Sequence, residues 1–209
     1  MEIRRVKKHD VDMTSGSVFR HLLNFAVPLL MGNIFQQLYN TVDTWVVGNY
    51  VSNEAFSAVG TVAPIINTLI GAFSGLASGA GVVISQYYGA GKYDRVKDAV
   101  HTAVMMTLVL SVVFTAIGIA MTPNMLRLMK TPAEVFPESR AYLNIYFSGM
   151  AGLMLYNMGA GILRAVGDSK RPFYYLVCAA VINTVLDLVF VIVFGMGVEG
   201  VAYATIIAQ

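Results

Sequence analysis

The sequence has 209 residues, of which 56% are hydrophobic and only 12% are charged, and its mean hydropathy of +0.65 lies well outside the range of ordinary soluble domains. These values predict a membrane protein. A net charge of +2 argues against a nucleic acid partner, and the single cysteine, Cys178, excludes a disulfide within the chain and a cysteine-based metal motif.

Six hydrophobic segments follow an N-terminal segment of residues 1–21. These runs are long and continuous, which favours helices over the short alternating strands of a membrane barrel. A helix needs about 20 residues to cross the hydrocarbon layer, so the first five segments can span it and the sixth covers roughly two-thirds of it. We therefore predict an all-α integral membrane protein with six transmembrane helices, the last one truncated. The segments are residues 22–48, 55–88, 99–122, 142–163, 173–194 and 197–209.

Most lysine and arginine residues lie on one side of the predicted membrane. They occupy the N-terminal segment and the loops after the second and fourth segments, whereas only Arg127, Lys130 and Arg140 lie on the other side. Because cytoplasmic loops carry an excess of these residues, the N-terminus is predicted to be cytoplasmic.

Two acidic residues, Asp43 and Asp187, lie in the interior of predicted spans, whereas Glu199 lies in the loop at the start of the sixth segment, and no lysine or arginine lies inside any span. An ionised carboxylate in hydrocarbon costs several kcal/mol or more unless something compensates its charge. A proton, a metal cation or water can do so. All three possibilities predict that the aspartates face a polar cavity within the bundle.

The spacing of polar residues in the first segment supports such a cavity. Asn33, Gln36, Asn40 and Asp43 follow one another at intervals of three, four and three residues, which places them on one face of a helix. Tyr39 is expected to face the same cavity. Polar residues in spans also bridge helices by hydrogen bonds, and for Asn33 this alternative stays open.

The fifth segment repeats the pattern, because Asn183 and Asp187 lie four residues apart on one helical face. Carboxylate, amide and hydroxyl oxygens suit Na⁺, and a carboxylate shielded from water can instead hold a proton. The residues thus predict a Na⁺ or proton site.

Other features of the spans predict packing. Gly71, Gly75 and Gly79 recur at every fourth position of the second segment and predict a close approach of helix backbones. Pro28 removes a backbone donor inside the first segment and is a candidate for bending it. Tyr142 and Tyr146 are expected in an aromatic belt at the membrane surface.

Four stretches resemble the multidrug and toxic compound extrusion (MATE) transporters and together cover nearly the whole chain. They are VPLLMGNIFQQLYNTVDTWVVG (27–48), SQYYGAGKYD (85–94), GILRAVGDSKRP (161–172) and GVEGVAYATIIAQ (197–209). The resemblance implies one six-helix lobe, the N-terminal one, of a twelve-helix antiporter in the inner membrane. Such a protein exchanges Na⁺ or H⁺ for organic, chiefly cationic, drugs or toxic metabolites by alternating access, without a prosthetic cofactor. A small organic substrate, the lipid bilayer and a missing C-terminal lobe are then the expected partners.

The resemblance also assigns roles to residues of this sequence. The positions that match the cation site of the family's prokaryotic branch are Asp43, Asn183, Asp187 and Thr205. Gln36, Tyr39 and Asn157 match residues of the substrate cavity, where Asn40 is also expected from its place on the polar face. Pro28 matches the proline that bends the first helix.

Several alternatives remain at this point. A flippase for lipid-linked precursors shares the superfold, although the lack of basic residues in the spans argues against an anionic lipid. An intramembrane aspartyl protease would use Asp43 and Asp187 as a dyad, but neither is in its expected motif, so we predict no enzyme. A non-transporting scaffold is disfavoured by the aspartates. The length fits one half of a longer parent protein, which we favour. It also fits a half that forms a dimer, or an inactive fragment.

Overall fold

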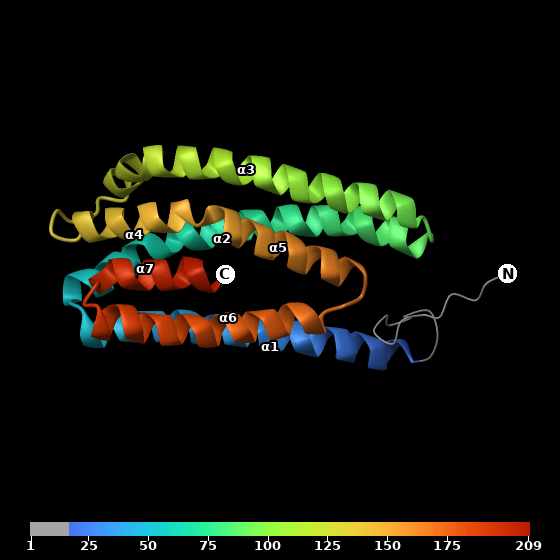
Figure 1. Cartoon of the computed structure of the whole chain (residues 1–209), viewed down its shortest axis with the longest axis horizontal. Coiled ribbons are helices and arrows are strands. Elements are labelled where there is room, and N and C mark those ends of the chain that lie inside the picture. The colour runs from blue at the N-terminus through green and yellow to red at the C-terminus, as the bar shows by residue number, and fades with distance from the viewer. Residues whose placement is uncertain (1–16) are drawn as a thin grey trace.

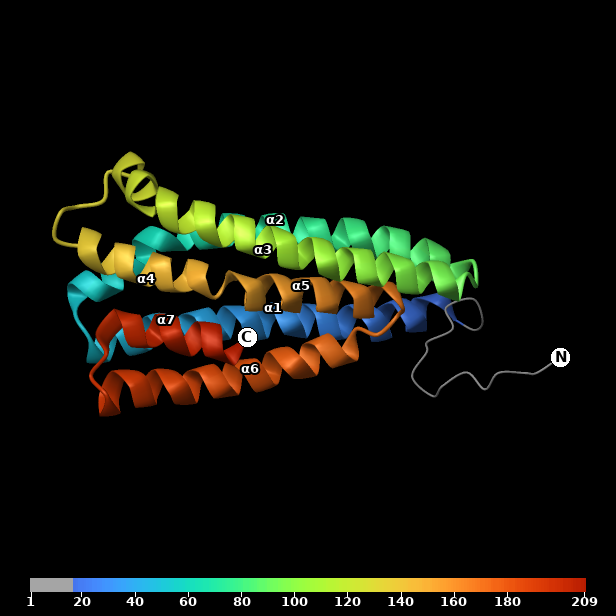
Figure 2. The same cartoon turned by 45° about the horizontal axis from the view of Figure 1, so that its top comes forward.

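The computed structural model describes residues 17–209, and in this part of the chain the regular elements are all helices. They run side by side along one axis, as Figures 1 and 2 show. The elements are α1 (Val18–Tyr50), α2 (Asn53–Gly89), α3 (Tyr93–Leu128), α4 (Phe136–Ser148), α5 (Met150–Ala165), α6 (Lys170–Leu188), the π-helical turn η1 (Val189–Val193) and α7 (Gly197–Ala208).

The predicted all-α membrane fold is confirmed, with one difference in the helix number. The fourth span, predicted as one helix over residues 142–163, divides into α4 and α5 at Gly149, and the helix α4 starts before the predicted span, at Phe136. A side chain at Gly149 would overlap Ile206 of α7, so the break lies where α7 packs closely. The described residues therefore form seven α-helices instead of six.

The first and fifth spans also differ in detail from the prediction. Helix α1 begins at Val18, four residues before the expected start, so the predicted N-terminal segment falls mainly outside the described residues. The fifth span ends in the π-helical turn η1. Pro28 lies within α1, which continues on both sides of it; its bending role stays a prediction.

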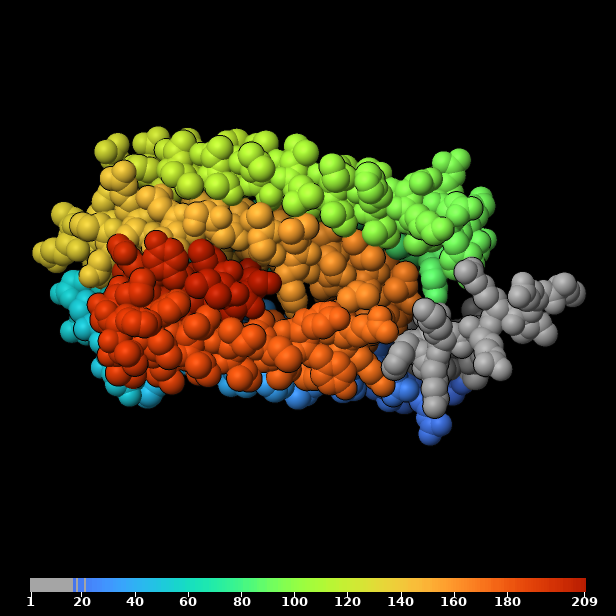
Figure 3. Space-filling view, in the orientation of Figure 1, coloured from blue at the N-terminus to red at the C-terminus, as the bar shows by residue number. Residues whose placement is uncertain are grey.

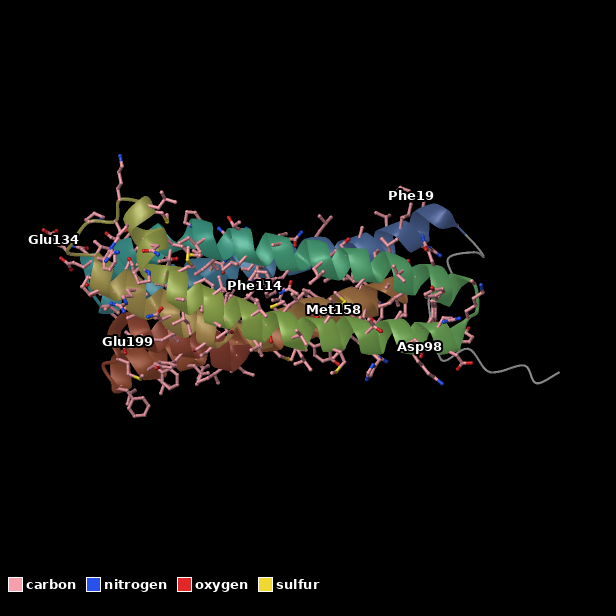
Figure 4. All side chains as sticks on the ribbon, turned by 90° about the horizontal axis from the view of Figure 1, so that it is seen from above. Phe19, Asp98, Phe114, Glu134, Met158 and Glu199 are labelled. Atoms are coloured by element: carbon pink, nitrogen blue, oxygen red, sulfur yellow. The ribbon has the colours of Figure 1, made fainter. Side chains whose placement is uncertain are left out.

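Three helical stretches in the described part are long and apolar enough to cross a membrane: α2, α3, and α6 continued by η1. Large apolar side chains on the outside of α3, including Val109, Val112 and Ile117, are exposed, as expected for a surface that faces lipid. Charged residues gather at the two ends of the bundle. In Figure 4, Asp98 lies near one end and Glu134 and Glu199 near the other.

We call these ends the Val18 end and the Tyr50 end, after the first and last residues of α1. The Val18 end carries Lys92, Lys97 and Lys170, in or close to the turns before α3 and α6, among other basic residues, and the Tyr50 end carries fewer. The N-terminal basic residues Arg4 to Lys8 lie outside the described residues. The cytoplasmic location of the Val18 end therefore stays a prediction.

Short turns fix the helix directions at both ends. The Ser52 hydroxyl caps α2 by accepting from the Ala55 amide at 3.0 Å. The turn between α5 and α6 contains Gly167 at φ +88°, a conformation that favours glycine, and Asp168, whose carboxylate accepts from the amides of Lys170 and Arg171 at 3.1 Å each. The chain consequently reverses at once after α5.

The main core lies between α2, α4, α5 and α7. Leu143, Phe147, Met150 and Val201 are almost completely buried there. Helices α2 and α5 approach closely near Gly161, where an added Cβ would lie 3.0 Å from the carbonyl oxygen of Ala77. Helix α7 packs in turn against α6 and, less extensively, against α1.

The predicted tight packing of Gly71, Gly75 and Gly79 is wrong for the described residues. A Cβ added at any of these glycines would meet no atom within 4 Å. These three glycines instead lie on an exposed strip of α2.

Candidate functional site

Three helices bring the predicted cation-site residues to one buried place. Asp43 comes from α1, Asn183 and Asp187 come from α6, and Thr205 comes from α7. Asn183 and Asp187 are completely buried, and Thr205 and Asp43 are 4% and 5% exposed. Asp43 and Asp187 are close enough for their carboxyl groups to interact electrostatically. Residues 162 positions apart in the sequence, Asp43 and Thr205, are thus neighbours.

The Thr205 hydroxyl has one proton, and its geometry shows where that proton points. Its oxygen lies 2.9 Å from the carbonyl oxygen of Val201 and 3.5 Å from Asp43 Oδ2. Because 3.5 Å is long for a hydrogen bond from a hydroxyl, the proton goes to Val201. The lone pairs of Thr205 are therefore free to face a cation beside Asp43.

The site contains several buried polar atoms without a hydrogen-bond partner in the described part of the chain. They are Asp43 Oδ1, both carboxylate oxygens of Asp187, both amide atoms of Asn183 and the Tyr39 hydroxyl oxygen. Buried polar groups normally have a partner, and unpaired buried carboxylates are costly. No salt bridge among residues 17–209 reaches either aspartate. This set of oxygens suits a small monovalent cation or a proton.

Three tyrosines surround the carboxylates. Tyr39, Tyr142 and Tyr146 are each at least 91% buried, and all three interact electrostatically with Asp43. The predicted place of Tyr142 and Tyr146 in an aromatic belt is therefore wrong. Their spacing of four residues, which places both on one face of α4, was the signal available in the sequence.

A cavity of about 610 Å³ leads from this site along α1. Its walls include Gln36, Tyr39 and Asn40 of α1 and Asn157 of α5, the residues predicted for a substrate cavity, and Asn33, Gln37 and Thr44 widen the polar side. Figure 3 shows a hollow in the face formed by α5, α6 and the end of α7. The polar face of α1 therefore lines a cavity that is partly open to the outside, since Asn33, Gln37 and Asn40 are exposed.

One basic residue also lines this cavity. Arg164, which lies one residue beyond the fourth span as predicted, belongs to α5 and contributes to the wall at the Val18 end. The predicted spans contain no basic residue, but the cavity wall does. The sequence pattern missed Arg164 because its motif lies at the boundary between span and loop.

The comparisons with known proteins agree with this architecture. The family model described as MatE matches residues 28–189. The probable multidrug resistance proteins YpnP and YoeA of Bacillus subtilis are 34% identical over 198 residues and 39% identical over 196 residues. These alignments cover 95% and 92% of this chain, and 44% and 42% of the two relatives.

A solved MOP superfamily transporter from Pyrococcus furiosus superimposes on the chain with a TM-score of 0.90 at 27% identity. The match covers 98% of this chain and 45% of that one, so the chain spans less than half the length of the proteins it resembles. This confirms the prediction of one lobe of a longer transporter fold. Since the family model matches well over half of its residues, the chain belongs to the MATE family of multidrug and toxic compound extrusion transporters.

Proposed function

We propose that the chain forms the N-terminal lobe of an antiporter that exports organic cations in exchange for Na⁺ or H⁺. The observation that carries this proposal is the buried pair of neighbouring carboxylates, Asp43 and Asp187, of which Asp43 lines a polar cavity. Like charges this close, with no basic partner in the described residues, need a cation or a proton between them.

The residues of the site would contribute to cation binding in different ways. Asp43 and Asp187 supply the charge, and the oxygens of Asn183 and Thr205 complete the shell. Tyr39, Tyr142 and Tyr146 limit the access of water, which strengthens the attraction between the carboxylates and a cation. Bulk water can then reach the cation, and compete with the site for it, mainly through the cavity.

Cation binding can be coupled to movement because the two aspartates belong to different helices. Without a cation, repulsion between the carboxylates favours separation of α1 from α6; with one, both helices are held together. Pro28, which lines the cavity and lacks an amide proton, gives α1 a place to bend. An organic cation attracted to Asp43 through the cavity would compete with the coupling ion.

We further propose that the protein lies in the inner membrane with the Val18 end in the cytoplasm, and that a second lobe completes the transport pathway. The distribution of basic residues supports the orientation. The second lobe is supported by the relatives, which are about twice as long as this chain.

The decisive experiment separates ion binding from transport. Binding of radioactive Na⁺ is measured on the purified 209-residue chain at several pH values, with Asp43→Asn, Asp187→Asn and the exposed control Asp94→Asn. We expect saturable binding that both site variants abolish, that the control keeps and that protons displace. Unchanged binding in Asp43→Asn would refute the assignment.

Transport is then followed in vesicles that contain the chain and ethidium, with a Na⁺ gradient or a pH gradient imposed alone. The gradient that drives ethidium movement identifies the coupling ion. Ion binding without transport would locate the ion site in this lobe and show that a further lobe is needed. Proteolysis of a peptide substrate, abolished in Asp43→Asn, would instead favour the aspartyl protease.

A further inference from the structure

The cavity has two chemically different ends. Asp43 and Thr205 line one end, and Arg164, Ser169 and Pro172 line the other, at the start of α6. On α1 the lining runs from Pro28 to Asp43, and these 15 residues of helix extend over about 22 Å. An anionic end and a cationic end therefore lie about four helical turns apart in the same cavity.

Arg164 has no acidic partner within residues 17–209, although it is partly buried. It lies near the hydroxyl of Tyr156, which donates to the carbonyl oxygen of Pro172 at 3.3 Å. Arg171, only seven residues further on, pairs with Asp168 at 3.1 Å. The acidic residue in this turn is thus already engaged, and the guanidinium in the cavity wall remains available to an anion.

The turn between α5 and α6 places a second donor beside this end of the cavity. The amide of Gly167 donates to the carbonyl of Arg164, and the amide of Asp168 donates to that of Leu163, so the chain folds back sharply. Ser169, 4% exposed, consequently lines the same end as Arg164. A guanidinium with a nearby hydroxyl is well suited to planar or tetrahedral oxyanions.

We propose that Arg164 and Ser169 form a site for the anionic group of an amphiphilic organic molecule, a carboxylate, sulfonate or phosphate. Apolar cavity residues such as Phe173 and Leu176 would contact the rest of the molecule. The proposal goes beyond the export of organic cations, because it makes the cavity receptive to anionic and zwitterionic compounds. It does not depend on ion binding at Asp43.

The test measures binding of naphthalene-2-sulfonate to the purified chain in a neutral detergent by calorimetry. Its uncharged counterpart, naphthalene-2-sulfonamide, controls for apolar binding. We expect Arg164→Gln to weaken sulfonate binding about tenfold or more, and Ser169→Ala to weaken it less. Arg164→Lys should retain part of the affinity, and the control Arg171→Gln should retain all of it. Sulfonamide binding should be the same in every variant.

Two results would overturn the proposal: sulfonate binding that is the same in Arg164→Gln as in the unchanged chain, or no binding of sulfonate at millimolar concentration. If Arg164→Gln does not give a monodisperse protein, Arg164→Lys and Ser169→Ala decide. Failure of the antiport proposal is recognised separately, because Asp43→Asn should lose Na⁺ binding and keep sulfonate binding.

A second arm identifies the source of the anionic group. The same titration is run in nanodiscs of phosphatidylglycerol and in nanodiscs of phosphatidylcholine. Equal sulfonate binding in both supports a free organic anion as the ligand. Weaker binding in phosphatidylglycerol, restored by lowering the fraction of that lipid, supports the headgroup of an anionic lipid at the same site.

Discussion

The side chain of Ile206 in α7 lies directly against the backbone of Gly149, at the break between α4 and α5. Ile206 follows Thr205, so the contact that fixes the end of α7 also fixes the hydroxyl beside Asp43. A residue without a side chain is needed at position 149 for this approach.

We therefore expect Gly149→Val to destabilise the protein by about 1–3 kcal/mol, because the new side chain overlaps Ile206 and forces α7 outward. Thermal unfolding in detergent measures the loss. Gly75→Val is the matched control, since a side chain at Gly75 meets nothing within 4 Å. Equal unfolding temperatures for the two variants would contradict the close contact.

Two substitutions of Thr205 distinguish the contribution of its hydroxyl oxygen to Na⁺ binding from that of its shape. Thr205→Val keeps the volume and removes the oxygen, so we expect Na⁺ affinity to fall about tenfold, whereas Thr205→Ser should keep most of it. Radioactive Na⁺ binding to the purified chain measures both. Should the valine variant bind Na⁺ as well as the serine variant, Thr205 is not a ligand.

Removal of one carboxylate should make the folded protein more stable in the absence of Na⁺. Asp187→Asn replaces one of two adjacent buried carboxyl groups by a neutral amide, and we expect a gain of about 1–3 kcal/mol. Addition of Na⁺ should then raise the unfolding temperature of the unchanged chain and have no effect on the variant. A variant that is less stable than the parent without Na⁺ would show that another group neutralises Asp187.

The stability of the Tyr50 end should depend on pH through Glu138, which lies before the predicted fourth span. Burial, and secondly the charge of Glu54, raise the pKa of Glu138 above its ordinary value of 4.5. The folded protein thus holds this proton more tightly than the unfolded chain does. The resulting stabilisation is complete below about pH 4.5 and is lost as the pH rises through the raised pKa.

Unfolding temperatures between pH 4 and 7 test this effect. We expect Glu138→Gln to reduce the decline toward pH 7, and Glu54→Gln to do so in part because it removes the repulsion. The effect is expected to be small, because Glu138 is only partly buried. Identical pH profiles for the parent and Glu138→Gln would rule out this contribution.

The sequence predicted well which polar side chains lie together inside the bundle and which face of α1 is polar, because both depend on strong local signals. A carboxylate such as Asp43 or Asp187 in an apolar run has a high free-energy cost unless its charge is compensated, wherever its helix lies in the bundle. A spacing of three and four residues defines one face of a helix, whichever helices become its neighbours. The order of the long helices followed from the hydropathy pattern of the sequence.

The features that the sequence did not predict all depend on which helices become neighbours. Gly149 breaks the fourth span only because Ile206 arrives there from α7, and the strip at Gly75 is exposed because no helix of the described chain covers it. Tyr142 and Tyr146 could equally have faced lipid headgroups. Arg164 was assigned to a loop because charge alone does not show that α5 continues past it.

The exposed strip of α2 has a practical use that follows from its lack of neighbours. A cysteine at Gly71, Gly75 or Gly79 would place its Cβ more than 4 Å from the other described helices, so a spectroscopic label can be attached there without a clash at its base. In a background where Cys178 is replaced, the mobility of such a label reports on what approaches this surface from outside, whether lipid, a second copy or another lobe. Labels on this strip can thus be used to measure contacts of the bundle with its surroundings without disturbing its interior.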